Sequence, residues 1–133
     1  MKELLAHLAG DYVFQNHWEA TKKTESNLPA LSHAVKYTAG FIPLTRNVKA
    51  LAIIGGTHYV LDRYRLAKQL SWAKNNLAVP RDMRYTWKEA KANAGYPKEV
   101  PEWLSTWLMI ITDNTVHMTI NHLALRRYNG LGN

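Results

Sequence analysis

Apolar residues recur at helical spacing along most of the chain. The first such run comprises Leu4, Leu5, Leu8, Tyr12 and Val13, whose three- and four-residue spacing is typical of one helix face. Breaks at glycine and proline separate this run from later ones. The pattern predicts four principal helices over residues 3–17, 29–41, 48–74 and 101–128, and one short helix over residues 86–93. Period-two alternation is not sustained anywhere, so we expect an all-α fold, a compact bundle of four principal helices plus a short extra helix.

Length and composition limit the class of protein. A chain of 133 residues suggests a single helical domain over residues 1–133. It contains no cysteine, which excludes disulfides and thiolate zinc sites and leaves nitrogen and oxygen as metal ligands. No apolar segment reaches the roughly 20 residues that a spanning helix needs, and no signal peptide is evident. We therefore expect a cytoplasmic protein without a membrane span.

The net charge of +7 favours anionic partners such as nucleotides, nucleic acid or anionic lipid. Solubility alone explains such a charge equally well. The basic residues are spread along the chain, and no block of five or more like charges indicates a nucleic-acid-binding arm. The charge thus favours a small anionic partner, for which a nucleotide is the leading candidate, with nucleic acid as an alternative.

Three histidine–aspartate pairs stand four residues apart, so each pair would share one helix face. His7 precedes Asp11 and His58 precedes Asp62, whereas Asp113 precedes His117. The chain has four aspartates and six histidines, and chance would pair three of the four aspartates in roughly a few cases per thousand. The pairs therefore indicate a shared site.

The order of histidine and aspartate within the three pairs is consistent with a single shared cluster. In an up-down-up-down bundle the last helix runs against the first and third, so its reversed pair would bring all the histidines to one level and all the aspartates to the next. A histidine on the second predicted helix could join either level. Mixed nitrogen and oxygen ligands suit two divalent transition-metal ions (Zn, Mn, Fe, Co or Ni). The predicted metal ligands are His7, Asp11, His33, His58, Asp62, Asp113 and His117.

The same stretches carry a family resemblance. "HLAGDYVFQNHW", "PALSHAVKYT", "GTHYVLDRYRLAKQLSWAKN" and "WLSTWLMIITDNTVHMTINHLAL" resemble a family of small phage and bacterial proteins known as domain of unknown function 3307. The resemblance implies an all-helical fold and a phage setting, in which case the compartment is the host cytoplasm. It implies no activity. The family's recurring polar positions correspond to His7, Asp11, Gln15, His33, His58, Asp62, Asp113 and His117.

Further polar residues flank these positions. Gln15 and Asn121 lie one turn beyond Asp11 and His117, where they would orient ligands or contact substrate. Basic residues near the pairs could neutralise phosphate oxygens. They are Lys22, Lys23, Arg63, Arg65 and Lys68. Solvated side chains are the alternative for all of them. The predicted substrate-binding residues are Gln15, Lys22, Arg63, Arg65 and Asn121.

Two other features concern packing. Gly55 and Gly56 interrupt the third predicted helix just before His58, where they would permit a close helix approach or a bend. Tryptophan side chains are expected to pack in the core or between helices. These tryptophans are Trp18, Trp72, Trp87, Trp103 and Trp107.

The sequence favours a metal-dependent phosphohydrolase or phosphodiesterase, acting on a phosphoester such as a nucleotide or a nucleotide signal. The metal ions would activate a bound water, and Asp62 or Asp11 would accept its proton. Two alternatives stay open. One is a non-catalytic protein in which metal staples the bundle and the surface binds nucleic acid or an anionic ligand. The other is a metal-free protein whose histidine–aspartate pairs are buried hydrogen bonds.

Overall fold

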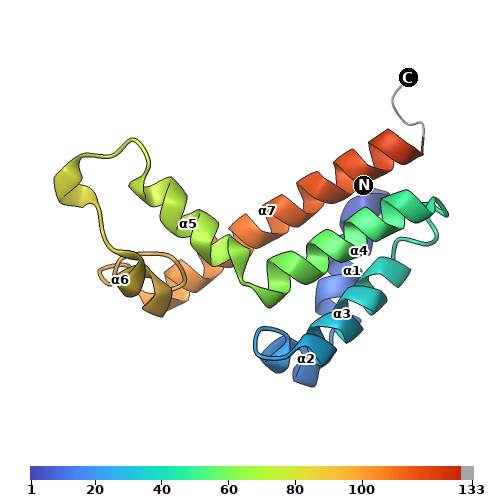
Figure 1. Ribbon diagram of the computed structural model, residues 1–133, viewed down its shortest axis with the longest axis horizontal. Helices are drawn as coiled ribbons and strands as arrows, with labels where there is room; N and C mark the ends of the chain where they lie inside the picture. The colour runs from blue at the N-terminus through green and yellow to red at the C-terminus, as the bar shows by residue number, and fades with distance from the viewer. Residues whose placement is uncertain (130–133) are drawn as a thin grey trace. The chain divides into compact units, whose positions relative to one another are not determined.

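The computed structural model describes residues 1–129, and these residues form helices joined by short connections (Figure 1). No strand occurs within them, which confirms the predicted all-α class. None of the helices in this range is both long and apolar enough to cross a membrane. In chain order the elements are α1 (Lys2–Tyr12), α2 (His17–Lys22), α3 (Asn27–Ala39), α4 (Val48–Arg63), α5 (Leu66–Asn76), the 3₁₀ helix η1 (Arg81–Met83), α6 (Trp87–Ala92) and α7 (Glu102–Tyr128).

The chain forms two compact units. The first unit contains Met1–Tyr64 together with the part of α7 that follows Thr115, and the second unit contains Arg65–Thr115. In the first unit, α3 packs against α1, α2 and α4, so it is the central helix. In the second unit, α5 packs against α6.

Two helix boundaries differ from the prediction. The first predicted helix, 3–17, ends at Tyr12 because Asn16 starts a new helix. The Asn16 side chain accepts a hydrogen bond from the backbone N–H of Glu19, and the Glu19 carboxylate accepts one from the backbone N–H of Asn16. This reciprocal capping box defines the N-terminus of α2.

The third predicted helix, 48–74, is divided between α4 and α5. Arg65 adopts a left-handed backbone with φ of 51° and breaks the helix there. This conformation is uncommon for a residue other than glycine. No glycine or proline stands between residues 57 and 79, so the hydrophobic pattern continues through the break without revealing it.

The apolar core of the first unit is small, and close helix approaches surround it. It consists of Tyr37, Phe41, Ile54, Ala124 and Leu125. A side chain at Gly10 of α1 would overlap the ring of Tyr37, and one at Gly55 of α4 would overlap the hydroxyl of Thr38. The predicted close approach at the glycine pair is therefore confirmed for Gly55.

The tryptophan prediction is only partly right. Trp72 and Trp87 pack edge to face in the second unit, with ring centroids 5.7 Å apart. Trp103 and Trp107 were expected to pack but are 67% and 61% exposed on α7. The buried residue between them is Ser105, whose hydroxyl donates to Asn93. Residues two positions away point to the opposite side of a helix, so burial of Ser105 turns both indoles outward. Trp18 of α2 is also substantially exposed.

The close approach at Gly10 gives a stability prediction with an internal control. Gly10→Ala should lower the free energy of unfolding by about 1–3 kcal/mol, because the methyl group would displace the Tyr37 ring. Gly56→Ala adds a methyl group where nothing lies within 4 Å, so it should be neutral or stabilise the helix by about 0.5–1 kcal/mol. Urea unfolding of the two variants tests this pair. Equal effects of both substitutions would show that the ring contact does not constrain α1.

Candidate metal centre

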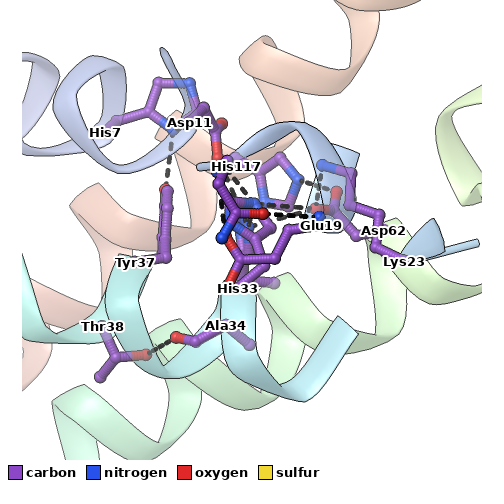
Figure 2. Close-up of polar contacts among 12 residues, drawn as sticks. His7, Asp11, Glu19, Lys23, His33, Ala34, Tyr37, Thr38, Asp62 and His117 are labelled. Carbon is purple, nitrogen blue, oxygen red and sulfur yellow. Dashed lines mark hydrogen bonds and ion pairs between the residues drawn. The ribbon is translucent and has the colours of Figure 1, made fainter. Parts of the chain in front are cut away.

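Six ionisable side chains converge in the first unit, and Figure 2 shows labelled members of the set pointing toward one another. The four imidazoles are at most 1% exposed, and the two carboxylate side chains are 11% and 5% exposed. The set comprises His7 and Asp11 from α1, His33 from α3, His58 and Asp62 from α4, and His117 from α7.

Three atoms in this cluster have the mutual spacing of ligands on one ion. The Nε2 atoms of His33 and His58 are 2.9 Å apart. Asp11 Oδ1 lies 3.3 Å from His33 Nε2 and 3.5 Å from His58 Nε2. Ligands at 2.0–2.1 Å from a tetrahedral zinc ion are about 3.3 Å from one another. Asp11, His33 and His58 therefore form a first ligand group.

A second ligand group contains His58, Asp62 and His117, and like the first its ligand atoms all lie within 4.8 Å of one another. Asp62 Oδ1 is 3.3 Å from His117 Nε2, and His58 Nδ1 is 3.2 Å from His117 Nδ1. The other oxygen, Asp62 Oδ2, is 3.3 Å from the Nε2 atoms of both His33 and His58. Asp62 thus presents one oxygen toward each group.

Nitrogen and oxygen atoms that can accept hydrogen bonds face one another in the cluster. Two imidazole nitrogens in contact repel unless one carries a hydrogen, and His58 makes such contacts at both nitrogens, with His33 and with His117. Asp11 Oδ1 is buried and has no hydrogen-bond partner, so its contact with His33 is one of charge rather than a well-aligned hydrogen bond. A cation among these atoms would satisfy the facing lone pairs.

The protonation states suit a cation. Burial raises the pKa of Asp62, but its contacts with His117, His33 and His58 outweigh burial and hold that pKa well below the usual range. Burial also raises the pKa of Asp11, and the facing His33 and the charge of His58 leave it lowered. Burial lowers the pKa of His58 to about 4, which Asp62 offsets only in part. Ionised carboxylates and a neutral imidazole are the forms that bind metal.

His33 behaves differently from His58. Burial lowers its pKa, but contacts with the carboxylates of Asp11 and Asp62 outweigh burial and leave it raised. A proton on His33 would therefore compete with a metal ion for the same Nε2 atom. Its Nδ1 atom is buried without a hydrogen-bond partner.

Tyr37 belongs to the cluster although the sequence analysis did not select it. Its ring stacks on His58 with centroids 3.6 Å apart and an interplanar angle of 13°. Its hydroxyl is 2.7 Å from His7 Nδ1 and accepts a hydrogen bond of 2.6 Å from Asn121 Nδ2. Tyr37 follows His33 by four residues, so the helical spacing that revealed the pairs could also have revealed it.

Glu19 was also missed as part of the site, and Lys23 was considered only as one of several basic residues, without its contact to Asp62. Lys23 Nζ lies 2.7 Å from Asp62 Oδ2. Glu19 is fully buried, and its carboxylate accepts a 2.6 Å hydrogen bond from Ser32 and pairs with Lys36 at 2.8 Å. The capping-box pattern around Glu19 was a usable signal, whereas no local spacing connects Lys23 with a residue 39 positions away.

The predicted ligands outside the two groups are His7 and Asp113. His7 Nδ1 contacts Tyr37 and lies 3.5 Å from Asp11 Oδ2, which places it beside the first group. Asp113 is half-buried one turn before His117 and falls within the second unit. The carboxylates of Asp11 and Asp62 interleave with the imidazoles, so the expected separation into two levels is not found.

The predicted substrate-binding residues are scattered. Gln15 lies in the loop after α1 rather than one helical turn beyond Asp11, and its Nε2 atom is buried without a hydrogen-bond partner. Asn121 is buried against Tyr37. Lys22 is exposed and pairs with Glu25 at 2.7 Å.

The two predicted arginines differ in position. Arg63 donates to the side chain of Asn27 and to the backbone carbonyls of Thr24 and Glu25. Its guanidinium therefore holds the segment after α2. Arg65 begins the second unit.

The fold and the cluster together define an all-α protein with a buried histidine–aspartate site. The chain belongs to the family described as protein of unknown function (DUF3307), whose model matches residues 1–81, and this confirms the resemblance. The matched region contains five members of the cluster and ends before His117. No curated protein and no solved structure matches the chain.

The lowered pKa of His58 predicts a pH dependence of stability in chelator. The unfolded chain takes up a proton at His58 near pH 6.5, but the folded protein does so only near pH 4. His58 therefore makes its full contribution to the free energy of unfolding above pH 6.5, where it is neutral in both states. It should fall by on the order of 3 kcal/mol as the pH drops to 4.

Urea unfolding of wild type and His58→Gln between pH 7 and pH 4 measures this contribution as the difference between the two proteins. The raised pKa of His33 has the opposite sign, since its contribution is lost as pH rises, and it is common to both proteins. A difference that stays constant, or grows toward low pH, would contradict a neutral buried His58.

Proposed function

We propose that the chain is a metal-dependent hydrolase that acts on a phosphoester such as a nucleotide or a nucleotide signal. The observation that carries the proposal is the buried triangle of Asp11 Oδ1, His33 Nε2 and His58 Nε2, with sides of 3.3, 2.9 and 3.5 Å. Such a group is costly to bury unless something positive lies among the acceptors.

Two divalent transition-metal ions suit the donor set. The two ligand groups share His58, and each of its ring nitrogens can serve only one ion. Asp11, His33 and His58 would hold the first ion, and Asp62 and His117 would be the main ligands of the second, with one Asp62 oxygen toward each group. Imidazole and carboxylate donors suit Zn, Mn, Fe, Co or Ni. With neutral imidazoles, the carboxylates of Asp11 and Asp62 (−2) and the ammonium of Lys23 (+1) give −1, which favours cation binding.

The bound ion would supply a hydroxide near neutral pH by lowering the pKa of its water to about 7. Asp11 is the more exposed of the two carboxylates, at 11% against 5%, so it is the better placed to accept the proton of that water. Asp62 faces both ligand groups and is better suited to hold metal. The net charge of +7 favours a negatively charged substrate.

A second candidate is a non-catalytic protein whose metal staples the helices and whose surface binds nucleic acid or another anionic ligand. Burial of all four imidazoles favours it, because structural metal sites are closed and catalytic sites keep an open position for water. The two candidates share metal binding and differ in turnover.

Metal content is the first test of the proposal. Protein purified without chelator should carry one to two transition-metal ions per chain, measured by elemental analysis. A chelator should lower the melting temperature, because a ligand present at 100 times its Kd stabilises the folded state by about 2.7 kcal/mol. Protein that carries no metal and takes up neither zinc nor manganese would refute both candidates.

Asp62→Ala separates metal binding from simple burial of charge. The variant should contain less metal, melt at a temperature insensitive to chelator, and lose hydrolysis of bis(p-nitrophenyl) phosphate, a generic phosphodiester. Asp82→Ala is the matched control, because Asp82 is the exposed aspartate in η1 with no role in the cluster.

The outcomes distinguish the candidates. Hydrolysis that depends on Asp62 supports the enzyme. Metal binding without hydrolysis of this or nucleotide phosphodiesters supports the staple. If Asp62→Ala melts higher than wild type and chelator affects neither, the cluster is a metal-free buried network, since removing one carboxylate has then relieved repulsion.

A further inference from the structure

We infer that Lys23 binds the anionic group of the substrate at this centre, and that it pairs with Asp62 only until a metal ion takes the carboxylate oxygen. The inference rests on the proposed function. It assigns anion recognition to a residue outside the predicted substrate-binding set.

Lys23 pairs directly with Asp62 Oδ2, a carboxylate oxygen that could bind metal. Its Nζ atom is 2.7 Å from Asp62 Oδ2, the oxygen that also lies 3.3 Å from His33 Nε2 and His58 Nε2. Figure 2 shows the lysine entering the cluster beside Asp62. The ammonium therefore pairs with the same oxygen that a metal ion in the first ligand group would bind.

Lys23 also lies where the cluster reaches solvent. Its side chain is 19% exposed and that of Asp11 is 11% exposed, whereas the imidazoles are at most 1% exposed. Lys23 and Asp11 are therefore the parts of the cluster most accessible to a small anion. Of the two, only the lysine attracts an anion.

Two anchors fix the segment that carries Lys23. Glu19, one turn earlier, is fully buried and bonded to Ser32 and Lys36 of α3. On the other side, Arg63 of α4 donates to the Thr24 carbonyl at 2.7 Å. The backbone on both sides of Lys23 is therefore held in place, unlike that of a typical surface lysine. The anchors reduce the entropy that Lys23 must lose when it binds an anion.

Electrostatics explains the exchange of partners. A metal ion about 2.0–2.2 Å from Asp62 Oδ2 would stand within about 5 Å of an ammonium that stays on the same oxygen, and charges repel strongly in a poorly solvated site. Metal binding should therefore weaken the Lys23–Asp62 pair. An anion that bridges the ion and the ammonium removes the repulsion, as in the clamps of phosphoryl-transfer sites.

The neighbouring cations lack this geometry. Lys22 is 53% exposed and pairs with Glu25. Arg63 already donates to three acceptors in residues 24–27. Lys22 is therefore a suitable control, because it has the same charge and stands next to Lys23 in the chain.

The test uses zinc alone and inorganic phosphate as probes, with calorimetric titration of the full chain. For zinc-loaded protein, Lys23→Gln should weaken phosphate binding at least tenfold, and Lys22→Gln should change it less than twofold. Lys23→Arg keeps the charge and should retain phosphate binding within a few-fold. Without phosphate, Lys23→Gln should bind zinc as tightly as wild type or more tightly, because a competing cation is gone. Thermal melting checks that each variant is folded.

The results separate this inference from the proposed function. A wild type that takes up neither zinc nor manganese overturns the proposed function and this inference with it; if only manganese binds, it replaces zinc in the titrations. Zinc-loaded wild type that binds no phosphate overturns the Lys23 assignment alone, as does equal phosphate binding with and without Lys23. Loss of zinc in Lys23→Gln, with Lys23→Arg equally impaired, identifies a structural role. Should Lys23→Gln fail to fold, phosphate binding by zinc-loaded Lys23→Arg and Lys23→Met decides the assignment.

Discussion

Charge balance around Asp62 is the constraint on which the first unit depends. This carboxylate is 5% exposed and lies against three imidazoles and one ammonium. An ion taken out of water loses several kcal/mol of hydration unless partners replace the water. Helices α3, α4 and α7 supply the imidazoles, and Lys23, directly after α2, supplies the ammonium. Their arrangement therefore neutralises Asp62 as well as burying apolar surface.

Tyr37 joins that polar cluster to the small apolar core. One neighbour of its ring is Phe41, with centroids 5.3 Å apart, and another is His58, stacked at 3.6 Å. Its hydroxyl is satisfied by Asn121 and contacts His7. A single buried side chain thus fixes imidazoles from two helices. Because α1 has glycine where it meets this ring, the face of α1 that carries His7 and Asp11 can approach the cluster closely.

Local spacing predicted the helical class and most of the cluster, and it failed where contacts are long-range. Residues four apart share a helix face, so His7 with Asp11 and His58 with Asp62 could be read from the sequence. The same rule also selected Asp113, which falls within the second unit. The left-handed Arg65 has no local marker. Lys23 meets its partner 39 residues away, and no periodicity encodes such a contact.

The first unit is assembled from both ends of the described chain, and the second unit is an insertion between α4 and the later part of α7. During synthesis, the helices that carry Asp11, His33 and Asp62 leave the ribosome well before His117. The nascent chain therefore holds an incomplete set of charge partners until α7 is made, and domains generally fold as units during translation. Asp62 therefore obtains its full set of partners only after the second unit has been synthesised.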